Sequence, residues 1–324
     1  MLINIALFVL GFAFLVKGAD FLVRGSSSLA KKLGVSDFFI GLTIVALGTS
    51  APELVVSLIA ALRGKSELLL GNLVGSNVAN TFLILGVAAL MSPLTVKERT
   101  VKREMPLLLL LTVLAILLLK DFSLRPVATS LSQVDGIVLI LSFLGFLAYV
   151  FNLHRRRREK LWQAEEKRYR LGQSIIMTAF GLAGLILGAH WIVGGVSFLA
   201  AAFGLKESFI GLTIVALGTS LPELAASLLA VYRHKQDMAV ANVIGSNIFN
   251  FSLILGLPAL FRPISFNPTL NRGLFFLLAA ILLLFAFMFA SQEQEPLATK
   301  RKILKRWQGA LFLFLYLIYL FYFT

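Results

Sequence analysis

The sequence predicts an all-α polytopic membrane protein with ten transmembrane helices, arranged as two inverted five-helix repeats. Three observations predict this fold class: an apolar composition, a series of apolar segments on the scale of a membrane span, and an internal repeat. The chain has 324 residues, of which 58% are hydrophobic and 14% are charged. Soluble domains are typically ~45–50% apolar and about 25% charged. The composition therefore excludes an ordinary soluble domain.

The net charge, the lack of cysteine and the small number of histidines exclude further classes of function. The formal net charge is +14, but in so apolar a chain basic residues belong to loops beside a membrane rather than to a nucleic-acid surface. The chain has no cysteine and only three histidines, which excludes thiolate chemistry and argues against a metalloenzyme. We find no nucleophile with a neighbouring base at membrane depth, so an enzyme is not expected.

Ten apolar segments fit a membrane span, which needs roughly 20 residues. They cover residues 2–30, 37–62, 68–91, 105–119, 134–153, 173–202, 208–232, 238–260, 272–290 and 307–323. The first lacks the basic n-region and cleavage site of a signal peptide, so we expect it to be retained. The fourth is the shortest and has Pro106 in its first turn.

Lys and Arg residues predict the orientation of these spans. Loops after odd-numbered spans hold 21 of them, and loops after even-numbered spans hold 7. Because short cytoplasmic loops carry the excess of Lys and Arg, we expect the odd loops in the cytoplasm and both termini outside. The basic segment 154–172 is then a cytosolic linker between residues 1–153 and residues 173–324.

The two halves of the chain repeat each other at an offset of 170 residues. Residues 41–50 and 211–220 share the ten letters GLTIVALGTS, and 16 of 20 positions match between 41–60 and 211–230. A second block, GNLVGSNVANTFLILG at 71–86, corresponds to ANVIGSNIFNFSLILG at 241–256. Each copy holds five spans, an odd number, so the second copy must cross the membrane in the opposite sense. Inverted repeats of this kind are typical of secondary transporters, with the binding site between the copies.

The first repeated motif predicts a broken helix. Pro52 has no N–H to donate to the carbonyl of Gly48, and Gly48 itself weakens the helix. Residues 219–223 repeat the arrangement. The pattern Ser-x-x-Glu also fits a capping box, with Ser50 capping the second half-helix. A buried carboxylate in a membrane is costly and needs a partner; since the motif segments hold no Lys or Arg, we expect Glu53 and Glu223 to bind a soluble cation.

The second motif places Asn72, Ser76 and Asn80 four residues apart, on one face of a helix. Its glycines favour close helix packing. The polar face, and its copy in the second half, predict the wall of the cation site: Ser76, Asn80, Ser246 and Asn250. Carboxylates, hydroxyls and amides are hard oxygen ligands, which suit Ca²⁺. Two negative charges balance one Ca²⁺ or two Na⁺, which suggests competition and therefore exchange.

At these motifs the chain resembles the sodium/calcium exchangers, in particular a short prokaryotic member without the large cytosolic insert of animal exchangers. The resemblance rests on the twin GTSxPE and GSNxxN motifs in two five-span halves. It implies that Glu53 and Glu223 ligate Ca²⁺, assisted by Thr49 and Thr219. It further implies that flanking Na⁺ sites are lined by Ser50, Ser76, Ser220, Ser246 and the backbone oxygens of Ala46 and Ala216, and that Asn80 and Asn250 complete the centre.

The resemblance also implies a location in the inner (cell) membrane of a prokaryote and no cofactor beyond the transported Ca²⁺ and Na⁺. Spans one and six would slide across the core. Some relatives carry Asp where this chain has Asn80 or Asn250, which puts potassium co-transport in doubt. Two alternatives remain open at this point: a H⁺/Ca²⁺ antiporter, and a passive cation channel. Asp20 and its counterpart His190 lie toward span ends, where we expect a structural or interfacial role.

Overall fold

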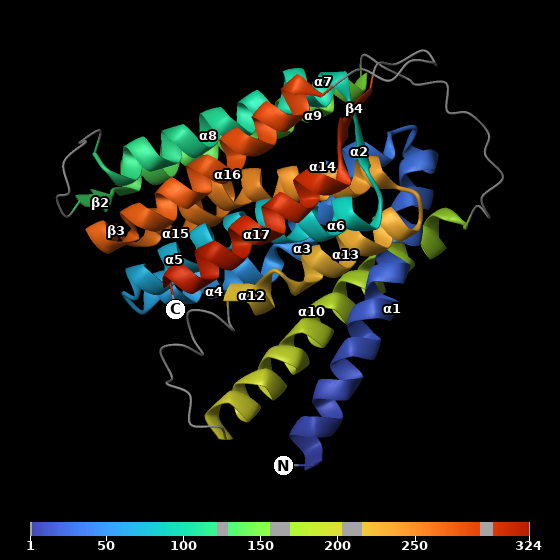
Figure 1. Cartoon of the computed structure of the whole chain (residues 1–324), viewed down its shortest axis with the longest axis horizontal. Helices are drawn as coiled ribbons and strands as arrows, with labels where there is room; N and C mark the ends of the chain where they lie inside the picture. Colours follow the sequence, from blue (N-terminus) through green and yellow to red (C-terminus); the bar gives the residue numbers. More distant parts are fainter. Residues whose placement is uncertain (1, 122–128, 156–168, 203–215, 292–300, 324) are drawn as a thin grey trace.

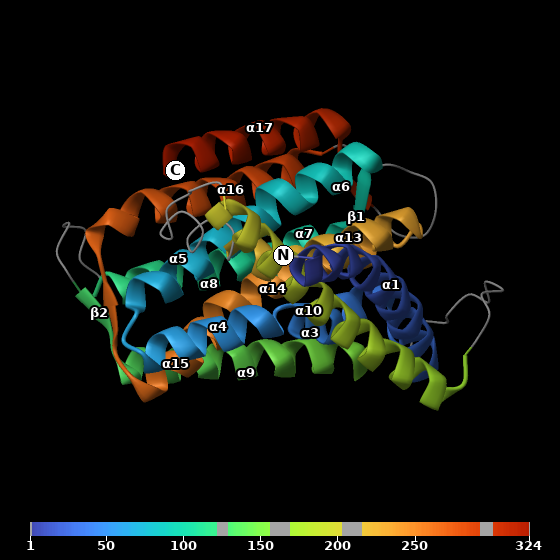
Figure 2. The same cartoon turned by 90° about the horizontal axis from the view of Figure 1, so that it is seen from below.

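The computed structural model describes residues 2–121, 129–155, 169–202, 216–291 and 301–323. The first eight residues of the predicted seventh span, which include the copy of GLTIV at 211–215, and linker residues 156–168 lie outside these ranges. The described residues are predominantly helical (Figures 1 and 2).

The first half contains α1 (Leu2–Leu33), α2 (Asp37–Ile40), the π-helix η1 (Gly41–Val45), α3 (Ala46–Thr49), α4 (Ala51–Leu62), α5 (Ser66–Val78), the π-helix η2 (Ala79–Ile84), α6 (Leu85–Met91), β1 (Leu94–Lys97), α7 (Glu98–Lys102), α8 (Glu104–Leu119), β2 (Thr129–Leu131) and α9 (Gln133–Arg155). The second half contains α10 (Leu171–Ala202), α12 (Ala216–Thr219), α13 (Leu221–Tyr232), α14 (Gln236–Phe249), the π-helix η4 (Asn250–Ile254), α15 (Leu255–Phe261), β3 (Ile264–Phe266), the 3₁₀-helix η5 (Pro268–Leu270), α16 (Asn271–Ala290), β4 (Arg301–Leu304) and α17 (Arg306–Phe323).

Six helical segments within the described ranges are long and apolar enough to cross a membrane. They are 6–33, 66–91, 133–152, 171–196, 236–261 and 268–290. A seventh is obtained if 37–49 and 51–62, which meet at an angle of 44°, are taken as one bent span. Shorter apolar helices cover 221–232 and 306–322. The all-α membrane architecture is therefore observed, whereas the count of ten spans stays a prediction.

Two long helices, α1 and α10, form an antiparallel pair that projects obliquely from the rest of the molecule (Figure 1). Glycines line their interface. A Cβ atom built on Gly181 would lie 2.4 Å from the amide nitrogen of Leu22, and one built on Gly18 would lie 2.7 Å from that of Leu185. Only glycine permits this backbone approach, so these two positions fix how closely the pair packs.

The centre of the molecule is formed by α14, whose residues from Met238 to Phe249 are all buried. Helix α5 is its counterpart in the first half, and α4 and α13 pack against α5 and α14 respectively. In a lipid-embedded protein the interior is where polar side chains can find partners. The buried asparagines, serines, threonines and glutamates of the repeated motifs gather here.

Two short antiparallel ladders join distant loops, a feature that the sequence analysis did not predict. Strand β1 pairs with β4, and β2 pairs with β3. The ladders lie at opposite ends of the helix bundle (Figure 1). Each ladder joins two loops that follow spans of the same parity, odd in one ladder and even in the other.

We predict that Gly181→Leu destabilises the protein by about 1–3 kcal/mol, because the new side chain meets the α1 backbone. The matched control is Gly194→Leu on the same helix, where an added Cβ has no neighbour within 4 Å. Thermal unfolding in detergent, followed by tryptophan fluorescence, measures the difference. Equal midpoints for the two variants would contradict the packing described here.

Candidate ion-binding site

A helix break occurs at the same place in both halves. Helix α3 ends at Thr49 and α4 begins at Ala51, with Ser50 between them at φ −83° and ψ 7°. Ser220 holds the equivalent position between α12 and α13 at φ −86° and ψ 1°. Each following helix has proline in its first turn, a position where the missing N–H costs little. The proline therefore fixes where the second half-helix begins.

The two glutamates lie in the first turns that follow these breaks, and both are buried, with 1% exposure for Glu53 and 0% for Glu223. The hydroxyl of Ser50 donates to Oε1 of Glu223 over 2.7 Å. Reciprocally, the hydroxyl of Ser220 donates to Oε1 of Glu53 over 3.3 Å. Each half of the chain thus supplies the hydrogen-bond donor for the carboxylate of the other half.

This exchange corrects the predicted capping box. Neither Ser50 nor Ser220 makes a side-chain capping hydrogen bond to the helix that it precedes. Both hydroxyls turn instead to a buried carboxylate, which is a stronger acceptor partner than a neutral group. The Ser-x-x-Glu pattern is present, but each serine hydroxyl bonds to the glutamate of the other half instead of capping its own helix.

Two hydrogen-bonded chains hold the residues before the breaks. Thr49 donates to Oδ1 of Asn242 over 3.3 Å, and the amide of Asn242 donates to Ser227 over 3.0 Å. The second chain reads the same way in the other half: Thr219 donates to Asn72 over 3.1 Å, and Asn72 donates to Ser57 at 3.5 Å. All six side chains are buried. The predicted site residues Thr49 and Thr219 are thus anchored across the repeat boundary.

The second motif brings Ser76, Asn80, Ser246 and Asn250 into the same buried region, each with an exposure of 1% or less. Ser246 donates to Oε1 of Glu223 over 3.4 Å. The amide of Asn80 donates to Oδ1 of Asn247 over 3.0 Å, and the amide of Asn247 donates to Thr81 over 3.0 Å. The π-helices η2 and η4 begin beside these asparagines, and such wide turns are frequent at functional sites.

The predicted backbone ligands begin the short helices before the breaks. The carbonyl of Ala46 accepts hydrogen bonds from the amide of Ser50 at 3.0 Å and from the hydroxyl of Thr49 at 3.3 Å. Ala216 is the first residue of α12.

Several oxygens in this region have no hydrogen-bond partner within the described ranges. They are Oε2 of Glu53, Oε2 of Glu223, the hydroxyl of Ser76, Oδ1 of Asn80 and Oδ1 of Asn250. Leaving a buried polar group unsatisfied costs about 1–3 kcal/mol, and more for a charged group. These five oxygens, two of them from carboxylates, constitute a donor set suited to a hard cation. The described part of the chain holds no cluster of three or more His, Cys, Asp or Glu, so neutral oxygens complete any such set.

The site also contains residues that the list of predicted ligands omitted: Asn72, Asn242, Ser57, Ser227, Asn247 and Thr81. A signal for most of them was present. Asn72 and Asn242 are related by the offset of 170 residues, as are Ser57 and Ser227. Identity between the two halves at these polar positions indicated a shared role. Thr81 corresponds to Phe251, so the repeat gave no indication for this residue.

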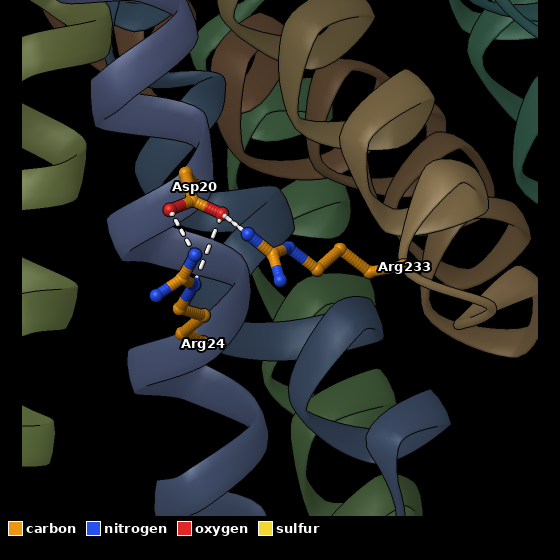
Figure 3. Close-up of polar contacts among 3 residues, drawn as sticks. All are labelled: Asp20, Arg24 and Arg233. Atoms are coloured by element: carbon orange, nitrogen blue, oxygen red, sulfur yellow. Dashed lines mark hydrogen bonds and ion pairs between the residues drawn. The ribbon is translucent and has the colours of Figure 1, made fainter.

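Asp20 lies outside this site and is part of an ion-pair cluster (Figure 3). Its Oδ2 is 2.9 Å from Nη2 of Arg24, one turn later on α1. Its Oδ1 also pairs with Arg233, the residue that ends α13. The carboxylate therefore connects α1 to the core, a structural role of the kind expected from the sequence. His190, its counterpart on α10, is exposed.

Comparison with known proteins places the two motifs in a family. The sequence profile of the sodium/calcium exchanger protein family matches residues 3–152 and 173–324. The chain belongs to this family. The two matched segments leave out only the first two residues and residues 153–172.

Relatives and solved structures of the family resemble the chain over nearly its whole length. Inner membrane protein YrbG of Escherichia coli K12 is 36% identical over 91% of both chains. Sodium/calcium exchanger MaX1 of Methanosarcina acetivorans is 34% identical over 98% of this chain and 97% of that protein. A structure of the sodium-calcium exchanger NCX_Mj, soaked with Na⁺ and Ca²⁺, has a TM-score of 0.82 at 32% identity and covers 98% of this chain and 97% of its own. The protein is therefore an integral membrane member of a cation/Ca²⁺ antiporter family.

We predict that Asn242→Ala destabilises the protein by about 1–3 kcal/mol, because Thr49 loses its partner across the repeat boundary and Ser227 loses its donor. The control is Ser142→Ala, since the hydroxyl of Ser142 is exposed and bonds to the carbonyl of Val138 within its own helix. Thermal unfolding without added ions measures both variants. A loss no larger than that of the control would show that the Asn242 bonds do not hold the break in place.

Proposed function

We propose that the chain exchanges Na⁺ for Ca²⁺ by alternating access, with the ions bound between its two halves. The observation that carries this proposal is the reciprocal pairing of the two breaks, in which Ser50 donates to Glu223 and Ser220 donates to Glu53. Two carboxylates held in the protein interior by each other's half form a site at the boundary between two movable units. Such a site is what alternating access requires.

The arrangement of the halves supports the inverted repeat of ten spans, with halves 1–153 and 173–324 joined by the linker 154–172. Helices α1 and α10 occupy equivalent positions in the two copies and run antiparallel. The strand ladders gather odd-numbered loops at one end and even-numbered loops at the other. With Lys and Arg concentrated in the odd loops, the linker is cytoplasmic and both termini are outside.

The oxygens that lack partners support the assignment of the ligands. Oε2 of Glu53 and of Glu223 are available to one Ca²⁺, which takes about 6–8 oxygens, with Thr49 and Thr219 beside them. The hydroxyls of Ser50, Ser220 and Ser246 each give their proton to a carboxylate. Their lone pairs therefore stay available to a cation. With Ser76 and the carbonyls of Ala46 and Ala216, they form the flanking Na⁺ sites, and Asn80 and Asn250 complete the centre.

Sodium coupling is favoured over proton coupling by the neutral oxygens. A H⁺/Ca²⁺ antiporter uses the unpartnered neutral oxygens, such as the Ser76 hydroxyl, only while Ca²⁺ is bound, because a proton needs only a carboxylate oxygen. Na⁺ needs several oxygen ligands and therefore uses the Ser76 hydroxyl in the Na⁺-bound state as well. The named relative MaX1 is a sodium/calcium exchanger, which agrees with this choice.

A passive channel is disfavoured by burial. A channel needs a continuous water path past its ion ligands, whereas both carboxylates have an exposure of 1% or less. An enzymatic role finds no support in the site, whose described side chains hold no His, Cys or Lys beside the two glutamates.

We predict that liposomes loaded with Na⁺ and containing the protein take up radioactive Ca²⁺ on dilution into Na⁺-free buffer, with pH equal on both sides. Glu53→Ala and Glu223→Ala should reduce uptake to the level of protein-free liposomes, because a single carboxylate cannot neutralise the divalent ion. Glu67→Ala, which removes an exposed glutamate from the start of α5, is the control and should transport normally.

The same assay separates the alternatives. Uptake that ignores Na⁺ but follows an imposed pH gradient would replace Na⁺ coupling with proton coupling. Uptake that needs no counter-ion and does not saturate would indicate a channel. Uptake that survives both glutamate substitutions would overturn the proposed site.

A further inference from the structure

A surface groove lies between α8 and α9, and none of its lining residues belongs to the site described above. Its volume is about 450 Å³, and it is lined by Arg103, Leu107, Leu110, Leu111, Leu114, Ser142, Gly145, Phe146 and Tyr149. Helix α8 packs on α14 and α16, and α9 packs on α15. Helices α8 and α9 also contact each other directly, through the hydrogen bond from Tyr149 to Glu104, and the groove lies beside that contact.

The groove has one polar end and one apolar end. Arg103 and Tyr149 lie at the polar end, and the leucines from Leu107 to Leu114 continue along α8 toward the membrane interior. The distance from Arg103 to Leu114 along the helix axis is roughly 16 Å at 1.5 Å per residue. One leaflet of the hydrocarbon core is about 15 Å thick, half of the whole. The apolar part of the groove thus matches the depth that one acyl chain occupies.

Among the described residues at the polar end, from Lys97 to Glu104, basic side chains outnumber acidic ones. Lys102 pairs with Glu98. The carboxylate of Glu104 is buried, accepts a hydrogen bond from Tyr149 at 3.1 Å and interacts with both Arg99 and Arg103. Two arginines therefore face one carboxylate. Nε and Nη2 of Arg99 are buried and make no hydrogen bond to any residue that the structure describes.

We propose that this groove binds an anionic phospholipid, with one acyl chain along the leucines and the phosphate at Arg103. Guanidinium groups bind phosphate through paired, charge-assisted hydrogen bonds. Anionic lipids are concentrated in the cytoplasmic leaflet, which is the side where the Lys and Arg distribution places the loop before α8. Neither the ion site nor the proposed exchange depends on this lipid.

The test uses native mass spectrometry of the delipidated full chain with phosphatidylglycerol or phosphatidylcholine of matched acyl chains. We expect phosphatidylglycerol to be retained preferentially, and Arg103→Gln to lower its retention about 10-fold, because the phosphate loses its charge-assisted hydrogen bonds to the guanidinium group. Lys32→Gln, which removes an exposed charge elsewhere, is the control. Gly145→Phe should lower the retention of both lipids, since an added Cβ at Gly145 meets nothing within 4 Å and the ring fills the groove.

Thermal midpoints of all variants establish that they fold, and Arg103→Lys, which keeps the charge, should retain most of the binding. Equal retention of the two lipids, or no effect of Arg103→Gln, would overturn the proposal. Displacement of phosphatidylglycerol by inorganic phosphate alone would also overturn it, because it would identify a site for free anions.

A second inference, which rests on the proposed inverted repeat, comes from the ion pairs of Asp20 (Figure 3). Arg233 ends α13, and Arg63 ends α4 at the equivalent place, 170 residues earlier. Cations are favourable at helix C-termini, which accounts for an arginine in both halves. The acidic partner, however, exists in only one half, because the residue equivalent to Asp20 is His190.

This asymmetry distinguishes the two conformations of the exchanger. In an inverted repeat, alternating access moves one unit against the other so that the halves exchange their arrangements. The arrangement in the structure brings Asp20 to Arg233. The reciprocal arrangement brings His190 to Arg63, which offers no ion pair. We infer that the Asp20–Arg233 pair is a latch that favours the conformation seen here, with α1 held against the cytoplasmic end of α13.

The absence of cysteine from the chain allows a direct test. Spin labels are attached to Leu33→Cys on α1 and Tyr232→Cys on α13, both exposed in the structure, and their distance distribution is measured in liposomes. Asp20→Asn should shift population toward a longer distance by about 2- to 5-fold, the effect of losing a partly exposed ion pair. His190→Asp should produce a shift in the same direction, because it supplies Arg63 with a partner in the reciprocal conformation.

The conservative variant Asp20→Glu, which keeps the negative charge beside both arginines, should retain the short distance. Unchanged distributions in Asp20→Asn and His190→Asp would overturn the latch. Because the distances are read without a transport assay, a failure of the latch is distinguishable from a failure of Na⁺/Ca²⁺ exchange, which the liposome uptake measures separately.

Discussion

The structure depends on one constraint: two carboxylates are buried in the interior of an apolar membrane protein, and each must be stabilised by a hydrogen-bond donor. Neither Glu53 nor Glu223 obtains its serine donor from its own half. The breaks at Ser50 and Ser220 turn the serine hydroxyls away from their own helices, and the Thr–Asn–Ser chains hold the preceding residues across the repeat boundary. The polar centre therefore ties the two halves together more specifically than the apolar contacts around it.

The crossed serine–glutamate bonds also explain why the helices that form the site differ from the helices that flank it. The helices of the repeated motifs, α4, α5, α13 and α14, pack closely and carry the buried polar side chains of the site, together with the breaks and π-helices beside them. Helices α1 and α10 contact each other through glycines, with few directional bonds across that interface. A surface of small residues can be displaced along its length at lower cost than a network of buried hydrogen bonds. The fold thus combines a centre held by buried hydrogen bonds with a flanking helix pair whose interface consists of small residues.

Much of this arrangement could be predicted from the sequence because the internal repeat marks it twice. Apolar composition predicted the all-α membrane class, and identity at Glu53, Ser50 and their copies selected residues that the structure brings together. The capping box was wrong because Ser-x-x-Glu describes only neighbours in sequence, whereas the acceptor of Ser50 lies 173 residues away. The strand ladders were missed for a related reason: each joins short loops that have no apolar pattern and lie far apart in the chain. The partner of Asp20 was also hidden, since Arg233 is 213 residues distant and appears in the sequence as an ordinary loop arginine.

The crossed serine–glutamate bonds also have a consequence for how the protein is made. Glu53 is synthesised 167 residues before Ser220, the residue that donates to it. At about 5–20 residues per second, this separation corresponds to on the order of 10 to 30 s of translation. During that interval the first half is already entering the membrane with an incomplete centre. The polar centre is therefore closed late in biogenesis, when the second half inserts, and neither half on its own contains a finished one.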